Sequence, residues 1–160
     1  MKKHLAKIVL CTIAVALVIV LLNLPKHSEQ QQAKAETTSI EAKIAKATEL
    51  VEHGQNPMEG IMLFREILKE DPENIEVHYR LGLFSLQSGQ MDKAVFRFEK
   101  VVGMNNPTYP DALFYLGQAY QAMGEKTKAL DAYTKYKSIT TDTVIVKGVD
   151  RIINELSNKN

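Results

Sequence analysis

Apolar residues recur at helical spacing through most of the chain after residue 40, with polar residues between them. The pattern is clearest in two stretches, 78–102 and 113–137, each with an apolar stripe, a glycine and a second apolar stripe. The stretches align with every equivalent pair 35 residues apart: Leu81-Gly82 with Leu116-Gly117, Gly89 with Gly124, Ala94 with Ala129, and Phe98 with Tyr133. Self-similarity at about this period predicts an array of helical hairpins.

The repeated glycines have two different roles. Gly124 follows the first apolar stripe of its stretch and should end that helix, because glycine tolerates the left-handed conformation of a C-terminal cap. Gly82 and Gly117 lie inside helices, where glycine costs about 1 kcal/mol against alanine. We therefore expect a close helix–helix approach at these two positions, with Ala94 and Ala129 as the small residues opposite.

Both stretches keep a Leu-Gly pair, followed later by an alanine with an aromatic residue four positions on. This order resembles the tetratricopeptide repeat, whose pattern is W-x2-L-G-x2-Y, then A-x3-F, then P. The resemblance implies an all-α solenoid of helical hairpins. The departures from the pattern are His78 and Leu113 at the tryptophan position, Ser85 at the tyrosine, a late closing Pro107, and Thr141 in place of the second closing proline. In this place we expect His78 to be a half-buried packing residue.

Residues 41–74 resemble a degenerate first repeat. Phe64 stands at the position of the aromatic residue in the later copies, and Asp71-Pro72 supplies the usual ending. Thr48 replaces the helix glycine, and Gly60 replaces the small alanine. Such departures are common in terminal repeats.

The segment after the last repeat has apolar residues on one helical face and Asp142 as a candidate N-cap. We expect it to form a capping helix at 144–157, because a solenoid needs a terminal element to cover its last apolar face. With repeats at about 41–74, 75–108 and 110–143, the repeat domain spans 39–157. It should contain seven helices, as three antiparallel pairs and the cap.

The first 24 residues form a separate element. Lys2, Lys3 and Lys7 precede an uncharged, largely apolar run at 8–22, and the apolar segment as a whole, 5–24, approaches the roughly 20 residues that span a bilayer. We favour a transmembrane helix that stays uncleaved as a signal-anchor. The alternative is a cleaved signal peptide, for which the small-x-small triplet at 33–35 is a candidate site.

Lysines are more frequent before the apolar run than after it, where Lys26 and Lys34 follow. The positive-inside rule then places the N-terminus in the cytoplasm and the repeat domain outside, in the periplasm if the source is bacterial. The polar segment 25–38 lacks aromatic residues, and we expect a flexible linker there. Thr38 and Glu41 have the spacing of a capping box and mark the expected start of the first repeat helix.

The composition and the motifs of the chain limit the classes of function that we expect. The formal charge of +1 gives no electrostatic reason to expect nucleic acid as a partner, and the single cysteine, Cys11, excludes a disulfide within the chain. No motif for phosphate binding, nucleophilic catalysis or a protein metal site is present, and the four histidines are scattered. We therefore expect no enzyme activity, cofactor, metal or small-molecule substrate.

In tetratricopeptide-repeat arrays the first helix of each repeat lines a concave groove. The resemblance places groove residues at Glu76, Tyr79, Leu83, Leu86 and Gln87, at Asp111, Phe114, Gln118, Gln121 and Ala122, and, in the degenerate repeat, at Ala42, Ala45, Glu49, Glu52 and His53. Aromatic anchors ringed by polar groups are typical of binding hot spots. Alternatively, Tyr79 and Phe114 stack neighbouring repeats.

Some tetratricopeptide-repeat domains hold the acidic C-terminal tails of chaperones with a carboxylate clamp of Lys, Asn and Arg. Here Tyr79 and Leu83 occupy the Lys and Asn places, and Phe114 and Gln118 repeat the mismatch. Arg80 alone matches loosely, and we include it among the predicted groove residues. We expect an apolar peptide or an amphipathic helix as the protein partner instead.

The resulting hypothesis is a membrane-anchored interaction scaffold that acts in assembly of envelope complexes. Two alternatives remain: a cleaved, soluble periplasmic or secreted subunit of a larger complex, and a cytosol-facing receptor of a eukaryotic organelle.

Overall fold

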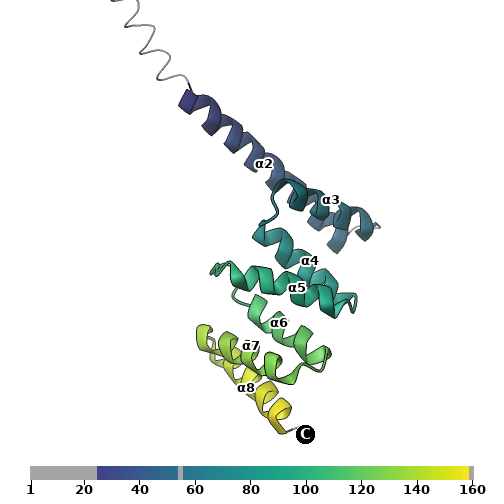
Figure 1. Ribbon diagram of the computed structural model, residues 1–160, viewed down its shortest axis with the longest axis vertical. Helices are drawn as coiled ribbons and strands as arrows, with labels where there is room; N and C mark the ends of the chain where they lie inside the picture. Colours follow the sequence, from purple (N-terminus) through teal and green to yellow (C-terminus); the bar gives the residue numbers. More distant parts are fainter. Residues whose placement is uncertain (1–24, 54–55, 159–160) are drawn as a thin grey trace, which may run out of the picture. The chain divides into compact units, whose positions relative to one another are not determined.

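The computed structural model describes residues 25–53 and 56–158, and these residues form helices and connecting turns without a strand. The helices are α2 (Pro25–Glu52), α3 (Pro57–Glu70), α4 (Ile75–Gln87), α5 (Met91–Gly103), α6 (Ala112–Ala122), α7 (Lys126–Ile139) and α8 (Thr143–Asn158) (Figure 1). The expected all-α architecture with seven helices is confirmed over this part of the chain. By internal contacts the chain divides into Met1–Ala42 and Lys43–Asn160.

In the first unit, the described residues 25–42 are helical. The expectation of a flexible linker at 25–38 differs from this structure, because α2 already begins at Pro25. Thr38 and Glu41 lie inside the helix and do not form a capping box at its start. The segment is rich in Ala, Gln, Glu and Lys, which favour helix even where no apolar face is buried. The predicted membrane anchor at 1–24 lies outside the described residues, and no described helix is long and apolar enough to cross a membrane.

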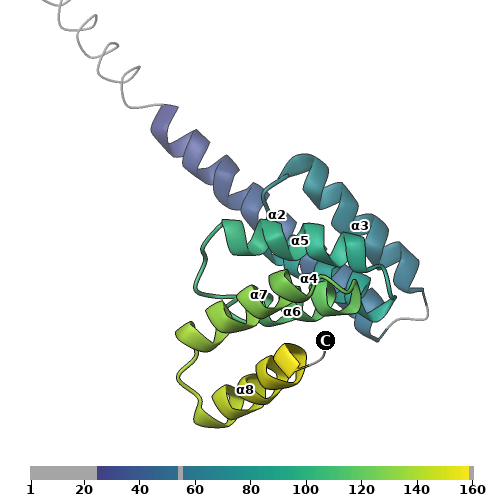
Figure 2. The same ribbon diagram turned by 60° about the horizontal axis from the view of Figure 1, so that its bottom comes forward.

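The second unit contains the repeats, which follow one another as helical pairs: the last turns of α2 with α3, α4 with α5, and α6 with α7 (Figure 1). Successive pairs contact each other through α3 and α4 and through α5 and α6, and α8 packs against α7 (Figure 2). The equivalent aromatic residues Phe64, Phe98 and Tyr133 are all at most 1% exposed. Each pair therefore buries one large ring at the same place, as the alignment predicts.

The helix glycines lie in the expected close helix–helix contact, and the nearest atoms across it belong to aromatic rings. A Cβ atom on Gly82 would lie 2.8 Å from Cε1 of Phe98, and one on Gly117 would lie 2.7 Å from Cε1 of Tyr133. The small residues Ala94 and Ala129, on the same second helices as these rings, are fully buried. On the second helix of each of these pairs, the aromatic ring therefore makes the nearest contact with the glycine of the first helix.

In the first pair, the glycine at the close helix–helix contact lies on the second helix instead of the first. Gly60 lies on the second helix, and a Cβ there would approach Ala47 O to 2.5 Å and Val51 Cγ2 to 2.7 Å. Thr48, at the position of the helix glycine, turns its hydroxyl back to donate to Ile44 O at 2.8 Å. The close approach of the two helices in this pair therefore depends on Gly60 of α3 and not on a glycine of α2.

The turns and caps follow the expected chemistry. Gly89 and Gly124 have φ of 74° and 77°, which is the left-handed region. After α6, the N–H of Glu125 donates to Tyr120 O at 2.9 Å, which closes the helix end. Asp142 caps α8, since its Oδ1 accepts from the N–H of Val144 at 2.8 Å.

His78 is more buried than expected, with 3% of its surface exposed. Its Nε2 lies 2.9 Å from Pro72 O and its Nδ1 lies 3.1 Å from an Arg97 Nη1. The carbonyl can only accept and the guanidinium can only donate, so the neutral ring with hydrogen on Nε2 satisfies both contacts. His78 is therefore a hydrogen-bonded core residue that joins α4 to α5 and to the loop before α4.

We expect stability to fall as the pH drops from about 7.5 to about 5.5, with a slope of at most about 1.4 kcal/mol per pH unit from this one group. Burial lowers the pKa of His78 below 6.5, the bond to Pro72 opposes this shift, and the charge of Arg97 adds to it. Below pH 6.5 the unfolded chain therefore binds a proton that the folded chain does not, so the contribution is present above that pH and is lost below it.

Urea unfolding of wild type and His78→Gln across this range is the measurement. Gln keeps an N–H for Pro72 but does not titrate, so its stability should depend less on pH. Equal pH slopes for the two proteins would contradict this account.

Candidate partner-binding groove

The residues predicted for the groove lie on the first helices of the pairs. Glu76, Tyr79, Arg80, Leu83, Leu86 and Gln87 are on α4, Phe114, Gln118 and Gln121 are on α6, and Asp111 is the residue before α6. Helix α4 contacts α6 directly. In the structure these residues contribute to three features: a hollow beside α4, a polar network at the rim of that hollow, and two sets of aromatic contacts.

A hollow of about 70 Å³ lies between the end of α2, helix α3 and helix α4. Its lining is mainly apolar and consists of Thr48, Val51, Glu52, Phe64, Arg80, Leu83, Phe84 and Gln87. Four of these, Glu52, Arg80, Leu83 and Gln87, were predicted as groove residues. The others were missed because their apolar or small side chains matched the helix faces that pack within a repeat, and the sequence has no separate signal for a gap between repeats.

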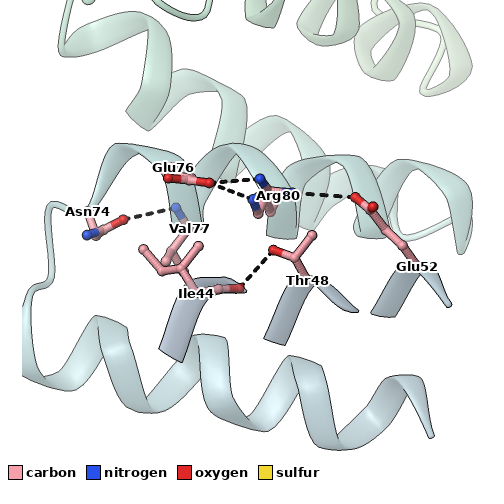
Figure 3. A network of polar contacts seen from close by, with 7 residues as sticks. All are labelled: Ile44, Thr48, Glu52, Asn74, Glu76, Val77 and Arg80. Atoms are coloured by element: carbon pink, nitrogen blue, oxygen red, sulfur yellow. Dashed lines mark hydrogen bonds and ion pairs between the residues drawn. The ribbon is translucent and has the colours of Figure 1, made fainter. Parts of the chain in front are cut away.

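A polar network borders the hollow (Figure 3). Arg80 Nη2 lies 2.8 Å from Glu76 Oε1, and Arg80 Nη1 lies 3.4 Å from Glu52 Oε1 on α2. These side chains are partly exposed, so each pair adds at most about 1 kcal/mol to stability. Their effect is on charge: Arg80, the one residue that loosely matches the carboxylate clamp, is already flanked by two carboxylates. The rim does not offer a free cation to an acidic tail.

Tyr79 is held in the contact between α4 and α6. Its ring centroid lies 4.7 Å from that of Tyr109 and 6.2 Å from that of Tyr115. Its hydroxyl donates to Asp111 Oδ2 at 2.6 Å. Burial, followed by this hydrogen bond, raises the pKa of Tyr79 well above its ordinary value, so the hydroxyl keeps its hydrogen for Asp111. These contacts favour the alternative in which Tyr79 stacks neighbouring repeats.

Phe114 has a similar setting one repeat later. Its centroid lies 5.6 Å from that of Tyr133 and 5.5 Å from that of Tyr136, both on α7. The Tyr133 hydroxyl donates to Gln121 Oε1 at 2.8 Å. The second predicted aromatic anchor and one predicted amide therefore hold α6 to α7.

The remaining predicted groove residues are spread along the same helices. Leu86 packs against the core cluster around Phe98, and Gln118 is half-buried. The degenerate repeat leaves Ala42, Ala45, Glu49, Glu52 and His53 exposed. Among the described residues, no group of His, Cys, Asp and Glu side chains could hold a metal ion.

Comparison with known proteins agrees with this architecture. Two stretches, 75–108 and 111–139, match models of the tetratricopeptide repeat. The fold is similar to that of the N-terminal domain of stress-induced protein-1 from C. elegans, with a TM-score of 0.64 and 18% sequence identity, over 76% of this chain and 97% of that one. No curated protein sequence matches the chain. The two strongest predicted repeats are thus confirmed as tetratricopeptide repeats.

Proposed function

We propose that this protein is a membrane-anchored interaction scaffold, which binds a peptide or amphipathic helix of a partner protein along its first helices. Tetratricopeptide repeats bind protein partners, and the hollow beside α4 is the observation that selects the contact point here. Its volume of about 70 Å³ suits one apolar side chain, and Val51, Phe64 and Leu83 supply apolar walls. Such a pocket with a polar rim is what a partner's anchoring residue requires.

The rim determines what else the partner offers. Arg80, Glu76 and Glu52 already form ion pairs, while Gln87 is exposed beside the apolar wall. The bound segment should therefore be anchored by an apolar residue and hydrogen-bonded at its edge, with little dependence on salt. Neither a terminal carboxylate nor a catalytic reaction is required for this activity.

We expect Gln87→Trp to weaken partner binding at least about thirtyfold, or about 2 kcal/mol, because an indole at the rim covers the hollow. Asn154→Trp, on the exposed surface of α8, is the control for the added ring. Full-length protein carrying each change would be purified from detergent-solubilised membranes, and its bound proteins quantified by mass spectrometry. Partners kept by Asn154→Trp and lost by Gln87→Trp bind at the hollow. An identical set of partners with both variants would exclude this site.

The membrane anchor is proposed from the sequence of residues 1–24, three lysines followed by an apolar run. The N-terminus would lie in the cytoplasm and the repeats outside, in a setting suited to assembly of envelope complexes. We expect the full-length chain to sediment with membranes and to resist carbonate extraction. A mature chain that begins near residue 36 and is recovered in the soluble fraction would instead indicate a cleaved signal and a soluble subunit.

Orientation is tested separately, by protease added to intact cells. Digestion of the repeats only after the cytoplasmic membrane is breached would contradict the outward orientation, and would favour the cytosol-facing receptor.

A further inference from the structure

The second helices of the first two repeats carry large apolar residues on their exposed side. Met58, Met62 and Phe96 are 59%, 56% and 53% exposed. Met62 and Phe96 each lie two residues before the buried aromatic residue of their repeat, so they occupy equivalent positions. In the third repeat this position is Asp131, which pairs with Lys135 at 2.7 Å, as is ordinary for a solvated helix face. At this position, exposed apolar residues are therefore found on α3 and α5 but not on α7.

Between these helices runs a cleft of about 480 Å³, here called the α3–α5 cleft. Its apolar lining includes Met58 and Ile61 on α3, Phe84 on α4 and Phe96 on α5. It shares only Phe84 with the lining of the hollow beside α4. The two sites can therefore be altered independently.

Two arginines from different helices also line the cleft. Arg65 is exposed on α3, and Arg97 is half-buried on α5, with its guanidinium 5.4 Å from the centroid of the Phe96 ring. Within the described part of the chain, neither arginine has a carboxylate within ion-pair distance. Burial, and next the positive charge of Arg65, lower the pKa of Arg97, so the two cations act on each other.

The charge of the cleft is positive as a whole. Lys93 adds a third cation, whose Nζ donates to Gln90 Oε1 at 2.6 Å, and Asp92 is the one carboxylate of the lining. An anion placed between Arg65 and Arg97 would offset their mutual repulsion. Guanidinium groups bind carboxylates in two-point contacts, and a half-buried arginine beside an aromatic ring is a common anchor in protein interfaces.

We propose that the α3–α5 cleft is a second docking site, which binds an acidic amphipathic segment of another protein. An apolar side chain of that segment lies between Met58 and Phe96, and its carboxylates contact Arg65 and Arg97.

Other occupants fit these features less well. Nucleic acid would need a longer track of cations than three side chains around an apolar cleft. A second copy of this chain could offer the exposed Ile139, Val144 and Ile145, but Asp142 beside them already accepts the N–H groups of Val144 and Ile145.

The test uses full-length protein in micelles of an uncharged detergent. The probe is a fluorescein-labelled helical peptide with a leucine stripe flanked by glutamates, and its match has glutamine for every glutamate. We expect the glutamate peptide to bind at least about tenfold more tightly than its match. Arg65→Gln should remove most of this difference in affinity. Phe96→Ala should lower the affinity for the glutamate peptide by about tenfold.

The controls are Arg151→Gln and Met123→Ala, which make the same kinds of change at exposed positions away from the cleft and should bind as wild type does. Gln87→Trp should also leave this binding unchanged, which separates the α3–α5 cleft from the hollow beside α4. The Arg65→Glu variant should lose affinity for the glutamate peptide and should bind a peptide that carries lysines in place of the glutamates.

Equal affinity for the glutamate and glutamine peptides would overturn the proposal, as would wild-type binding by both Arg65→Gln and Phe96→Ala. A dimer detected by sedimentation equilibrium and abolished by Phe96→Ala would also overturn it, because a second copy would then occupy the cleft. Tighter binding to single-stranded RNA than to the glutamate peptide would also overturn the proposal, because the cleft would then be a nucleic-acid site.

Discussion

Replacing Phe98 with alanine should lower the free energy of unfolding by about 3–5 kcal/mol. The Phe98 ring is fully buried at the centre of the second repeat. It fills the notch over Gly82 and stacks on Tyr115, with centroids 5.6 Å apart. Removing it leaves a cavity that a glycine on the facing helix cannot fill. The loss is a large fraction of the total stability of a domain, about 5–15 kcal/mol.

The measurement is urea unfolding followed by circular dichroism, and Phe96→Ala is the control. Phe96 is the same residue type two positions away on α5 but is 53% exposed, so its truncation should change the unfolding free energy by less than about 0.5 kcal/mol. If the two alanine variants were equally stable, the assignment of Phe98 to the core would fail.

Gly82→Val should cost about 2–3 kcal/mol, although valine is the better helix former. Its Cβ would lie 2.8 Å from Phe98 Cε1 and 2.9 Å from Cζ, so the buried ring must move. Because the penalty comes from this ring, the same change should cost less in a Phe98→Ala background, where the valine occupies vacated space. Double-mutant analysis of unfolding measures the coupling, and additive costs would contradict the proposed contact.

Gly148→Ala supplies the opposite case within the same fold. Gly148 lies in the middle of α8, and an added Cβ would meet no atom within 4 Å. We expect this substitution to stabilise the protein by up to about 1 kcal/mol, through helix propensity alone. A loss of stability similar to that of Gly82→Val would mean that the close ring contact does not explain the effect at Gly82.

Features that depend on local sequence were predictable. The repeat period, the glycine turns, the cap at Asp142 and the buried Phe64, Phe98 and Tyr133 all follow from residue types at fixed spacing along one helix or one turn. Helical periodicity determines which residues share a face, and the left-handed conformation after a helix favours glycine. The confirmed repeats at 75–108 and 111–139 rest on these signals.

The predicted groove could be derived from the sequence only in part. The resemblance identified the first-helix positions, and four of them do surround the hollow beside α4. It did not show whether Tyr79 and Phe114 point to a partner or to the next helix. Their rings pack on Tyr109 and Tyr136, which belong to other elements, so their role depends on the separation of helices that are far apart in sequence.

By itself, the sequence determined that the chain carries helical repeats, where their helices turn, and which aromatic residue each repeat buries. Only the tertiary structure decided that the atoms nearest to Gly82 belong to Phe98, and that Arg65 and Arg97 line one cleft. It also showed the segment 25–38 as helix. The physical reason is the range of the interactions: periodicity and capping act within a few residues of one helix, whereas contacts across helices depend on how two faces slide and rotate until their side chains fit.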